Sequence, residues 1–372
     1  MSQDETPDSE PVDGAALGDL RARIDDIDVR IQQLIADRAK TAREIGERKG
    51  SAAAAEYYRP EREAQVLRRV VERNAGPLSD EEMVRVFREV MSACLAQEEP
   101  LKIAYLGPEG TFTHQAVTKH FGHSVRALSV PTIDEIFHEV EAGIADFGIA
   151  PVENSTEGTV NHTLDMFLTS PLKICGEVEL RIHQHLMGRM KELAQIRRIC
   201  SHSQSLAQCR GWLAQYLPNV ELIQVASNAE AARRARDEEG TAALAGDAAA
   251  IVYDLRILFR EVEDQGDNTT RFLAVGRKLL APSGSDKTSL LFSSAGEQGP
   301  GLLLALLQPL ANHGINMTRI ESRPSRRRKW DYVFFVDVDG HAEEAPLAGA
   351  IEEVRSQSDL FRVLGAYPKA VL

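Results

Sequence analysis

Residues 102–111 read Lys-Ile-Ala-Tyr-Leu-Gly-Pro-Glu-Gly-Thr, and this stretch marks a change of architecture within the chain. Its first five residues form a short apolar run that is typical of a buried strand, and the glycines and the proline after it are typical of a turn that leads into a helix. The same order of strand, turn and helix recurs around residues 145–150, 196–200 and 241–244. This alternation predicts an α/β domain with a mostly parallel sheet.

Upstream of this stretch, the apolar residues are spaced for helices. They recur every three or four positions from Leu17 to Ile45, until Gly50-Ser51 interrupts the pattern. We expect one long amphipathic helix here, followed by helices over about 59–74 and 79–98, the last of them capped by Ser79. The long helix has too few partners in its own chain to cover its apolar stripe, so we expect a homodimer or a higher homo-oligomer.

Downstream, residues 281–287 read Ala-Pro-Ser-Gly-Ser-Asp-Lys, which indicates a linker. The segments at 288–293, 301–313, 317–322, 330–338, 347–357 and 361–367 then predict the order β-α-β-β-α-β, a ferredoxin-like α+β domain. The expected chain is multidomain: a disordered tail (1–16), an all-α helical domain (17–99), an α/β domain (101–280), the linker (281–287) and the ferredoxin-like domain (288–368).

The composition excludes several classes of function. With 43 basic and 56 acidic side chains and a net charge of −13, neither a nucleic-acid surface nor an anionic membrane face is expected. The four cysteines include no Cys-x-x-Cys pair, and His183 and His185 have no evident third ligand, so no metal is expected. The N-terminus shows neither a secretory signal nor a membrane span, and we expect a cytoplasmic protein.

Three short motifs follow one another in the second part of the chain: Pro-Val-Glu-Asn at 151–154, Thr-Arg-Phe at 270–272 and Glu-Ser-Arg-Pro at 321–324. In this order they resemble the prephenate dehydratase family with its phenylalanine-sensing ACT domain, and the helical segment resembles the all-helical chorismate mutases. The resemblance covers all but about the first sixteen residues. It implies a two-lobed dehydratase fold like that of periplasmic binding proteins.

The implied function is that of a bifunctional enzyme of phenylalanine biosynthesis. The substrates would be chorismate, which a Claisen rearrangement converts to prephenate, and prephenate, which loses water and carbon dioxide to give phenylpyruvate. L-phenylalanine would be the inhibitor. Two alternatives stay open: a cytoplasmic amino-acid-sensing binding protein without turnover, and an enzyme in which one activity is lost. The combination of Thr-Arg-Phe with a full set of mutase cations favours the enzyme.

The mutase site would be built from cations on the long helix. Arg38 and Lys49 lie about 16 Å and about 20° apart on a helix, so both can lean toward one dicarboxylate. Arg21 lies about 25 Å from Arg38 and about 100° round the axis, so it must serve the site of the other protomer if it acts. The resemblance further implies substrate-binding roles for Arg59, Arg62, Glu63 and Cys94.

Lys49 and Glu98 are the expected catalytic residues of the mutase. Many members of the family have glutamine at the position of Glu98, where it donates a hydrogen bond to the ether oxygen whose bond breaks. A carboxyl group can donate only when it is protonated. A pericyclic rearrangement needs no nucleophile, so these groups would act by electrostatic positioning. Taken singly, each cation is also explained as a solvated residue on an amphipathic helix.

The dehydratase reaction needs a proton donor near the departing ring hydroxyl, and it demands no cofactor. We expect Thr270 to lie closest to that hydroxyl, Arg271 to hold a carboxylate, and Glu153 or a water to complete the proton relay. The resemblance adds Asn154, Ser201, His202 and Gln208. Thr111 stands at a helix N-terminus, where it can cap the helix and the backbone can offer donors to an anion. Taken singly, Ser201 is also explained as a helix cap and His202 as a structural histidine.

The C-terminal domain would bind the effector across a dimer interface. Gly301 lets a ligand approach the backbone closely, and Asn316 can pair with an amino or carboxyl group. The expected effector-binding residues are Gly301, Leu302, Asn316, Glu321, Ser322, Arg323 and Pro324. The basic run at 326–329 is interpreted as a solvated hairpin tip. We expect a chain that ends near Ser285 to keep both activities and to lose the inhibition.

Overall fold

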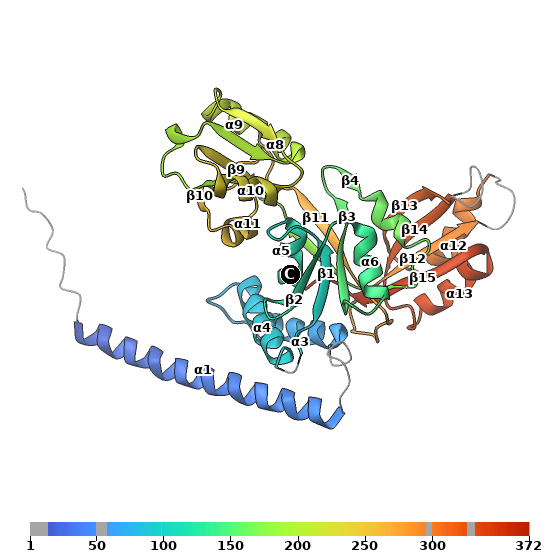
Figure 1. Cartoon of the computed structure of the whole chain (residues 1–372). Coiled ribbons are helices and arrows are strands. Elements are labelled where there is room, and N and C mark those ends of the chain that lie inside the picture. Colours follow the sequence, from blue (N-terminus) through green and yellow to red (C-terminus); the bar gives the residue numbers. More distant parts are fainter. Residues whose placement is uncertain (1–13, 50–57, 98, 295–299, 326–331, 372) are drawn as a thin grey trace, which may run out of the picture. The chain divides into compact units, whose positions relative to one another are not determined.

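The structure is a computed structural model of the chain, and it describes residues 14–49, 58–97, 99–294, 300–325 and 332–371 (Figure 1). Residues 1–53 and 54–372 form two units, and each is described by itself. The first of the three helices expected in the all-α domain falls in the first unit, and the other two fall in the second.

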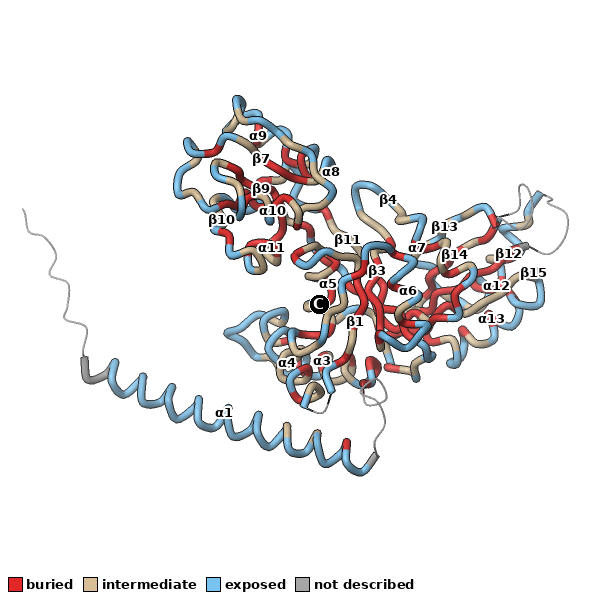
Figure 2. The backbone as a smooth tube through the Cα atoms, viewed as in Figure 1, coloured by how far each residue is buried: buried red, intermediate tan, exposed pale blue. Residues whose placement is uncertain are grey.

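The first unit contains the long helix predicted from the sequence. This helix, α1 (Gly14–Lys49), begins within the segment expected to be a disordered tail, whose residues 1–13 lie outside the described ranges. Its surface is exposed along nearly the whole length (Figure 2). The exposed residues include the apolar stripe Leu17, Leu20, Ile24, Ile27, Ile31, Leu34, Ile35 and Ile45. An apolar stripe of this length favours a helix that is covered in an oligomer.

The second unit begins with the two other predicted helices, α3 (Pro60–Arg73) and α4 (Asp80–Leu95). Ser79 caps α4, since its hydroxyl oxygen accepts a hydrogen bond of 3.2 Å from the backbone N–H of Glu82. Tyr58, just before α3, packs with ring centroids 5.6 Å from Phe121 and 5.4 Å from Phe147. These contacts join α3 and α4 to the α/β segment that follows.

The first sheet of the α/β segment has the strand order β2-β1-β3-β11-β5, with β4 beside β3. Its elements are β1 (Lys102–Leu106), α5 (Phe112–Phe121), β2 (Arg126–Val130), α6 (Ile133–Glu141), β3 (Phe147–Asn154), β4 (Gly158–Thr159), α7 (Asn161–Met166), β5 (Lys173–Arg181) and β11 (Thr269–Gly276). β1 pairs with β2 and β3 in parallel, but β11 is antiparallel to β3 and β5. The prediction of a mostly parallel sheet was wrong, because β11 returns from the second lobe and enters this sheet in the opposite direction.

The second lobe is inserted between β5 and β11 and has the strand order β10-β6-β9-β7-β8. Its elements are β6 (His185–Gly188), η1 (Leu193–Gln195), β7 (Arg198–Ser201), α8 (Ser203–Gln208), α9 (Arg210–Tyr216), β8 (Glu221–Gln224), α10 (Asn228–Asp237), β9 (Thr241–Ala245), α11 (Asp247–Val252) and β10 (Arg256–Phe259). The chain thus leaves the first sheet once and returns once, which gives the expected two-lobed α/β arrangement.

The C-terminal segment has the predicted order β-α-β-β-α-β. Its elements are β12 (Asp286–Ser294), α12 (Leu302–Asn312), β13 (Met317–Pro324), β14 (Tyr332–Asp339), α13 (Leu347–Ser356) and β15 (Ser358–Pro368). The antiparallel strands lie in the order β13-β14-β12-β15. This confirms the ferredoxin-like arrangement.

The C-terminal sheet shares a hydrophobic core with the first sheet. This core joins Phe137, Phe167 and Leu273 of the α/β segment to Leu291, Phe335 and Tyr367 of the C-terminal sheet. β15 comes so close to β5 that a Cβ atom at Gly365 would lie 2.2 Å from the carbonyl oxygen of Ile174. The two sheets therefore pack as one body rather than as domains on a loose tether.

The segment expected to be a linker is ordered and partly buried. Ser283 and Asp286 are buried, and the Ser283 hydroxyl donates a hydrogen bond of 2.6 Å to Asp286 Oδ1. Arg68 on α3 donates through Nη2 to the carbonyl oxygen of Ser283 at 2.6 Å. β12 already begins at Asp286, so the expected linker at 281–287 overlaps the first strand of the C-terminal sheet.

Candidate functional site

Asn154 and Thr270 face each other across the ladder between β3 and β11. Asn154 Nδ2 donates hydrogen bonds of 2.8 Å to Thr270 Oγ1 and to Asn268 Oδ1. Its Oδ1 accepts from the backbone N–H groups of Thr156 and Glu157 at 3.0 and 3.1 Å, which fixes the orientation of the amide. Because Thr270 Oγ1 accepts from Asn154, its own O–H stays able to donate to a third group.

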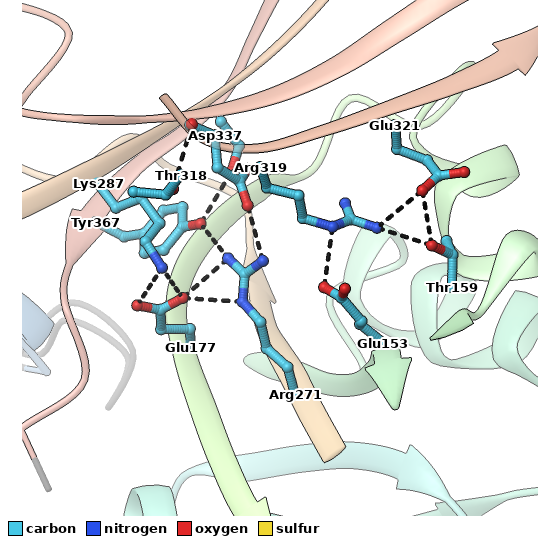
Figure 3. Close-up of polar contacts among 11 residues, drawn as sticks. Glu153, Thr159, Glu177, Arg271, Lys287, Thr318, Arg319, Glu321, Asp337 and Tyr367 are labelled. Atoms are coloured by element: carbon cyan, nitrogen blue, oxygen red, sulfur yellow. Dashed lines mark hydrogen bonds and ion pairs between the residues drawn. The ribbon is translucent and has the colours of Figure 1, made fainter. Parts of the chain in front are cut away.

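Glu153 and Arg271 form the next rung of the same ladder, but they face the other side of the sheet. Neighbouring strand residues point to opposite faces, so these two side chains point away from the pair formed by Asn154 and Thr270. Both reach toward the C-terminal sheet instead (Figure 3). The expectation that Arg271 holds a substrate carboxylate and that Glu153 completes the relay to Thr270 does not fit this geometry.

Arg271 lies in a buried ionic cluster between the two sheets (Figure 3). Its Nε donates to Glu177 at 3.0 Å, its Nη1 to Asp337 at 2.7 Å and its Nη2 to the Tyr367 hydroxyl at 3.1 Å. Lys287 donates to both oxygens of Glu177, at 2.8 and 2.7 Å. Two cations therefore balance two carboxylates, which is the condition for charges to be tolerated in a low-dielectric interior.

The environment of this cluster fixes its protonation. Burial alone would lower the pKa of Arg271, but Tyr367, Asp337 and Glu177 together raise it well above the usual range of arginine. Burial, followed by the charge of Asp337, raises the pKa of Tyr367 well above that of a free tyrosine. Arg271 is therefore charged and Tyr367 neutral at physiological pH, so the cluster acts as a fixed ionic joint.

Glu153 is held by Arg319 of β13. Arg319 Nε lies 2.9 Å from Glu153 Oε2, and its Nη2 donates to Thr159 Oγ1 at 3.2 Å. The Thr159 hydroxyl in turn donates to Glu321 at 2.8 Å, and Arg319 Nη2 lies 3.8 Å from the same carboxylate (Figure 3). One arginine thus links a residue beside the Asn154–Thr270 pair to the Glu-Ser-Arg-Pro motif.

β13 presents alternate residues to the α/β segment. Arg319, Glu321 and Arg323 are partly buried against it, and Arg323 Nη2 donates to Asp165 on α7 at 2.9 Å. Ser322 and Pro324 are exposed on the other face. Of the expected effector-binding residues, two therefore turn inward and two outward. The sequence signal for this is the pattern Arg-x-Glu-x-Arg at 319–323, which has the period of two of a strand.

The other expected effector residues lie at or near the ends of helix α12. Gly301 is its N-cap, with a left-handed φ of 86°, and is exposed, while Leu302 is partly buried. Asn316 donates through Nδ2 to Asp339 at 2.9 Å. The positive φ explains why glycine stands at position 301. The expected hairpin tip at 326–329 lies outside the described residues.

Ser201, His202 and Gln208 lie in the second lobe, around the C-terminal end of β7 and helix α8. The Ser201 hydroxyl is fully buried and donates to the Leu244 carbonyl at 2.7 Å, so it does not cap α8. The backbone N–H of His202 donates to Asn228 Oδ1 at 3.1 Å, and Gln208 Oε1 accepts from Gln184 at 3.4 Å. Sequence reasoning missed Asn228, whose only local signal is its place after the helix-capping Ser227.

Thr111 caps helix α5, and its hydroxyl oxygen accepts from the N–H of His114 at 3.4 Å. The turn before it contacts the second lobe, since the Tyr253 hydroxyl donates to the Glu109 carbonyl at 3.1 Å. Thr111 follows the carboxyl end of β1, and Asn154 is the last residue of β3, which is parallel to β1. Ligands of open α/β sheets bind at such ends.

The mutase residues are only partly described. Arg21 and Arg38 are exposed on α1, while the side chain of Lys49 and residue Glu98 lie outside the described parts of the chain. Arg59 is the N-cap of α3, Arg62 Nη1 donates to Gln65 at 3.5 Å, and Cys94 is buried on α4.

Glu63 lines a cavity of about 710 Å³ between α3 and β5. It lies 3.6 Å from Arg88 of α4, which sequence reasoning missed because the two residues stand on different helices. Asn154 and Thr270 are not among the lining residues, so this cavity is separate from the pair on β3 and β11.

His183 and His185 have separate partners. His183 Nδ1 lies 2.7 Å from Glu263, and His185 Nε2 lies 3.1 Å from Asp247. Within the described ranges, no three His, Cys, Asp or Glu side chains are grouped as metal ligands. None of the described helices combines the length and the apolar character that a membrane span requires.

Comparison with known proteins places three family models along the chain in order. Chorismate mutase type II matches residues 20–99, prephenate dehydratase residues 103–279 and the ACT domain residues 289–356. The chain is 52% identical over 358 residues to a bifunctional chorismate mutase/prephenate dehydratase of Pseudomonas aeruginosa, covering 95% of this chain and 98% of that one. The corresponding protein of Neisseria gonorrhoeae is 50% identical, with 95% and 97% covered.

A solved structure resembles most of the second unit. It is the prephenate dehydratase of Arthrobacter aurescens in complex with L-Phe, with a TM-score of 0.66 and 33% identity over 73% of this chain and 93% of that one. Its match and the order of the three family models agree with the fold described above. The chain belongs to the family of bifunctional chorismate mutase/prephenate dehydratases.

Proposed function

We propose that this protein converts chorismate to prephenate and prephenate to phenylpyruvate, and that L-phenylalanine inhibits it. The observation that carries the dehydratase half is the hydrogen bond from Asn154 to Thr270, which leaves the threonine proton free to be donated. The family membership supports the division of labour: mutase at 17–99, dehydratase at 101–280 and effector binding at 288–368. A cytoplasmic location fits such a biosynthetic enzyme.

In the dehydratase reaction, the ring carboxylate of prephenate leaves as carbon dioxide. The electron pair of the broken C–C bond enters the ring, the C–O bond to the ring hydroxyl breaks, and one proton converts the departing hydroxide to water. Thr270 delivers this proton, and Asn154 orients its hydroxyl. Since Glu153 faces the C-terminal sheet, a water rather than this carboxylate returns the proton to Thr270. Thr111 at the N-cap of α5, His202 at the N-cap of α8 and Gln208 within α8 position the substrate, and the buried Ser201 holds the end of β7 that leads into α8.

The mutase site is completed by two copies of the chain. Arg38, Lys49 and Arg62 of one protomer hold the dicarboxylate, and Arg21 serves the site of the partner. Glu63 binds the ring hydroxyl, and protonated Glu98 donates to the ether oxygen. The exposed apolar stripe on α1 supports this arrangement, because a second copy of the helix would cover it. We therefore propose a homodimer or a higher homo-oligomer.

The test is to incubate the purified protein with chorismate and to follow prephenate and phenylpyruvate over time, with and without L-phenylalanine. We expect prephenate to appear first, phenylpyruvate to follow, and the second step to slow when phenylalanine is added. Calorimetry measures phenylalanine binding on the same sample. Binding of phenylalanine with no turnover of either substrate would instead identify an amino-acid-sensing protein without activity.

A further inference from the structure

The residues that flank Asn154 and Thr270 on their strands are both held by the C-terminal sheet. Glu153 precedes Asn154 and is paired with Arg319 at 2.9 Å, and Arg271 follows Thr270 and is paired with Asp337 at 2.7 Å. We propose that Arg319 and Asp337 are positioning residues of the dehydratase site, so that the C-terminal sheet sets the geometry of the Asn154–Thr270 pair. This inference rests on the dehydratase function proposed above.

β5 holds β11 in a regular register from Thr269 to Ala274, but the ladder between β11 and β3 is interrupted at this end. β11 pairs with β3 in a regular register from Phe272 to Val275, but the register shifts between Arg271 and Phe272. Such a bulge leaves one residue without a ladder partner and bends the strand locally. The rung of Glu153 and Arg271 and the rung of Asn154 and Thr270 both lie beyond this shift, so the position of β3 against β11 depends more on side-chain contacts here than in the regular part.

The two ion pairs, Arg271 with Asp337 and Arg319 with Glu153, are called the clamp below, and their geometry suits them to position the strands. The side chains of Arg271 and Asp337 are 12% and 8% exposed, so water screens the charges of this pair weakly, whereas the pair of Arg319 (12% exposed) with Glu153 (39% exposed) is screened more. Arg271 uses its three nitrogens on Glu177, Asp337 and Tyr367, which fixes the plane of the guanidinium as well as its position. Movement of β13 or β14 would therefore displace the backbone on either side of the catalytic pair.

The clamp also connects the Asn154–Thr270 pair to β13, the strand that carries the expected effector residue Glu321. Arg319 and Glu321 are inward-facing neighbours on β13, and the Thr159 hydroxyl lies between them with hydrogen bonds to both. A ligand that engages Glu321 would change the partners of Thr159 and Arg319, and through Arg319 those of Glu153. This gives effector binding a physical route to the turnover rate, without any contact between effector and substrate.

The test uses the full-length protein with Arg319→Gln and Glu153→Gln, singly and together. The two pairs formed by β13 allow a matched control: Asp165→Asn removes the partner of Arg323, on the same strand and at the same interface, but away from Asn154 and Thr270. We expect each clamp variant to lower the dehydratase kcat about 10- to 100-fold, with a much smaller change in KM, because a displacement of about 1 Å costs this much. The double variant should be no worse than the worse single one. Asp165→Asn should keep the parent kcat.

A second measurement does not depend on activity. Hydrogen exchange of the amides of Thr156 and Glu157, which are bonded to Asn154 Oδ1, should be faster in Arg319→Gln and unchanged in Asp165→Asn. Unchanged kcat and unchanged exchange in Arg319→Gln would overturn the inference, as would equal losses in Asp165→Asn. If the parent protein formed no phenylpyruvate, the proposed function would fail, while the exchange data would still decide whether Arg319 holds the strand.

Discussion

Asn154 Nδ2 lies 2.8 Å from Thr270 Oγ1, and the amide that makes this bond is itself held by two backbone N–H groups. The threonine oxygen is therefore a hydrogen-bond acceptor from a fixed donor, and its proton points elsewhere. A threonine held in this way differs from one on a free surface, because the hydrogen bond from Asn154 limits the directions in which its O–H can point.

Thr270→Ala should remove the proton donor of the dehydratase. We expect kcat for prephenate to fall about 10²- to 10⁴-fold, which is the usual contribution of a positioned acid or base. Mutase activity should stay at the parent level, because Thr270 lies in the dehydratase segment and its side chain is hydrogen-bonded to Asn154 of the same segment. Thr270→Ser keeps the hydroxyl and should retain a large part of the activity. Near-normal phenylpyruvate formation by the alanine variant would show that another group delivers the proton.

Arg271→Met should destabilise the protein rather than weaken substrate binding alone. The change leaves Glu177 and Asp337 buried without their shared cation, and removal of one partner from a buried ion pair costs about 3–5 kcal/mol. Denaturant unfolding of parent and variant measures the loss. Lys369→Met, which removes a partly exposed pair with Asp339, is the control and should cost less than about 1 kcal/mol. If the unfolding midpoint were unchanged and the KM for prephenate were raised, Arg271 would instead be a substrate-binding residue.

The buried thiol of Cys175 should lower the free energy of unfolding as the pH rises into the alkaline range. Burial, followed by the charge of Glu61, raises the pKa of this thiol to about 12, whereas an unfolded cysteine titrates at about 8.5. The unfolded chain thus loses the proton first, so the stabilisation is complete below about pH 8.5 and is lost as the pH rises toward 12. Unfolding measured at pH 8 and pH 10.5 should show a smaller difference for Cys175→Ala than for the parent. Equal pH dependence in both proteins would contradict this.

Glu98→Gln should flatten the pH dependence of the mutase. The glutamate must be protonated to donate to the ether oxygen, so parent activity should fall as the pH rises through neutrality, whereas an amide donates at every pH. A low dielectric and the carboxylates of the substrate would favour the protonated form, and Lys49 would oppose it. The measurement is kcat/KM for chorismate from pH 5 to 9. A parent profile that is flat to pH 9 would remove the argument.

The helices and the C-terminal order of elements were predictable because their signals are local. Ser79 caps its helix and the stripe from Leu17 to Ile45 has a helical period, and both appear in the structure as predicted. The positions of Glu153 and Arg271 were not predictable in the same way. Their strands could be recognised, but nothing local shows which face of the sheet a later segment covers. Asn228 and Arg88 were missed for a related reason, since their partners are distant in the sequence.

The core that Leu291, Phe335 and Tyr367 share with Phe137 and Leu273 determines how this enzyme can lose its feedback control. Deleting the C-terminal segment would open that core to water and leave Arg271 without Asp337, so a chain that ends near Ser285 should fold poorly instead of working unregulated. Insensitive forms should therefore arise by substitution on the outer face of β13, at positions such as Ser322, where a changed side chain disturbs no buried contact. In selection or engineering, variants that resist inhibition should therefore carry single substitutions, and truncated genes should not be recovered among them.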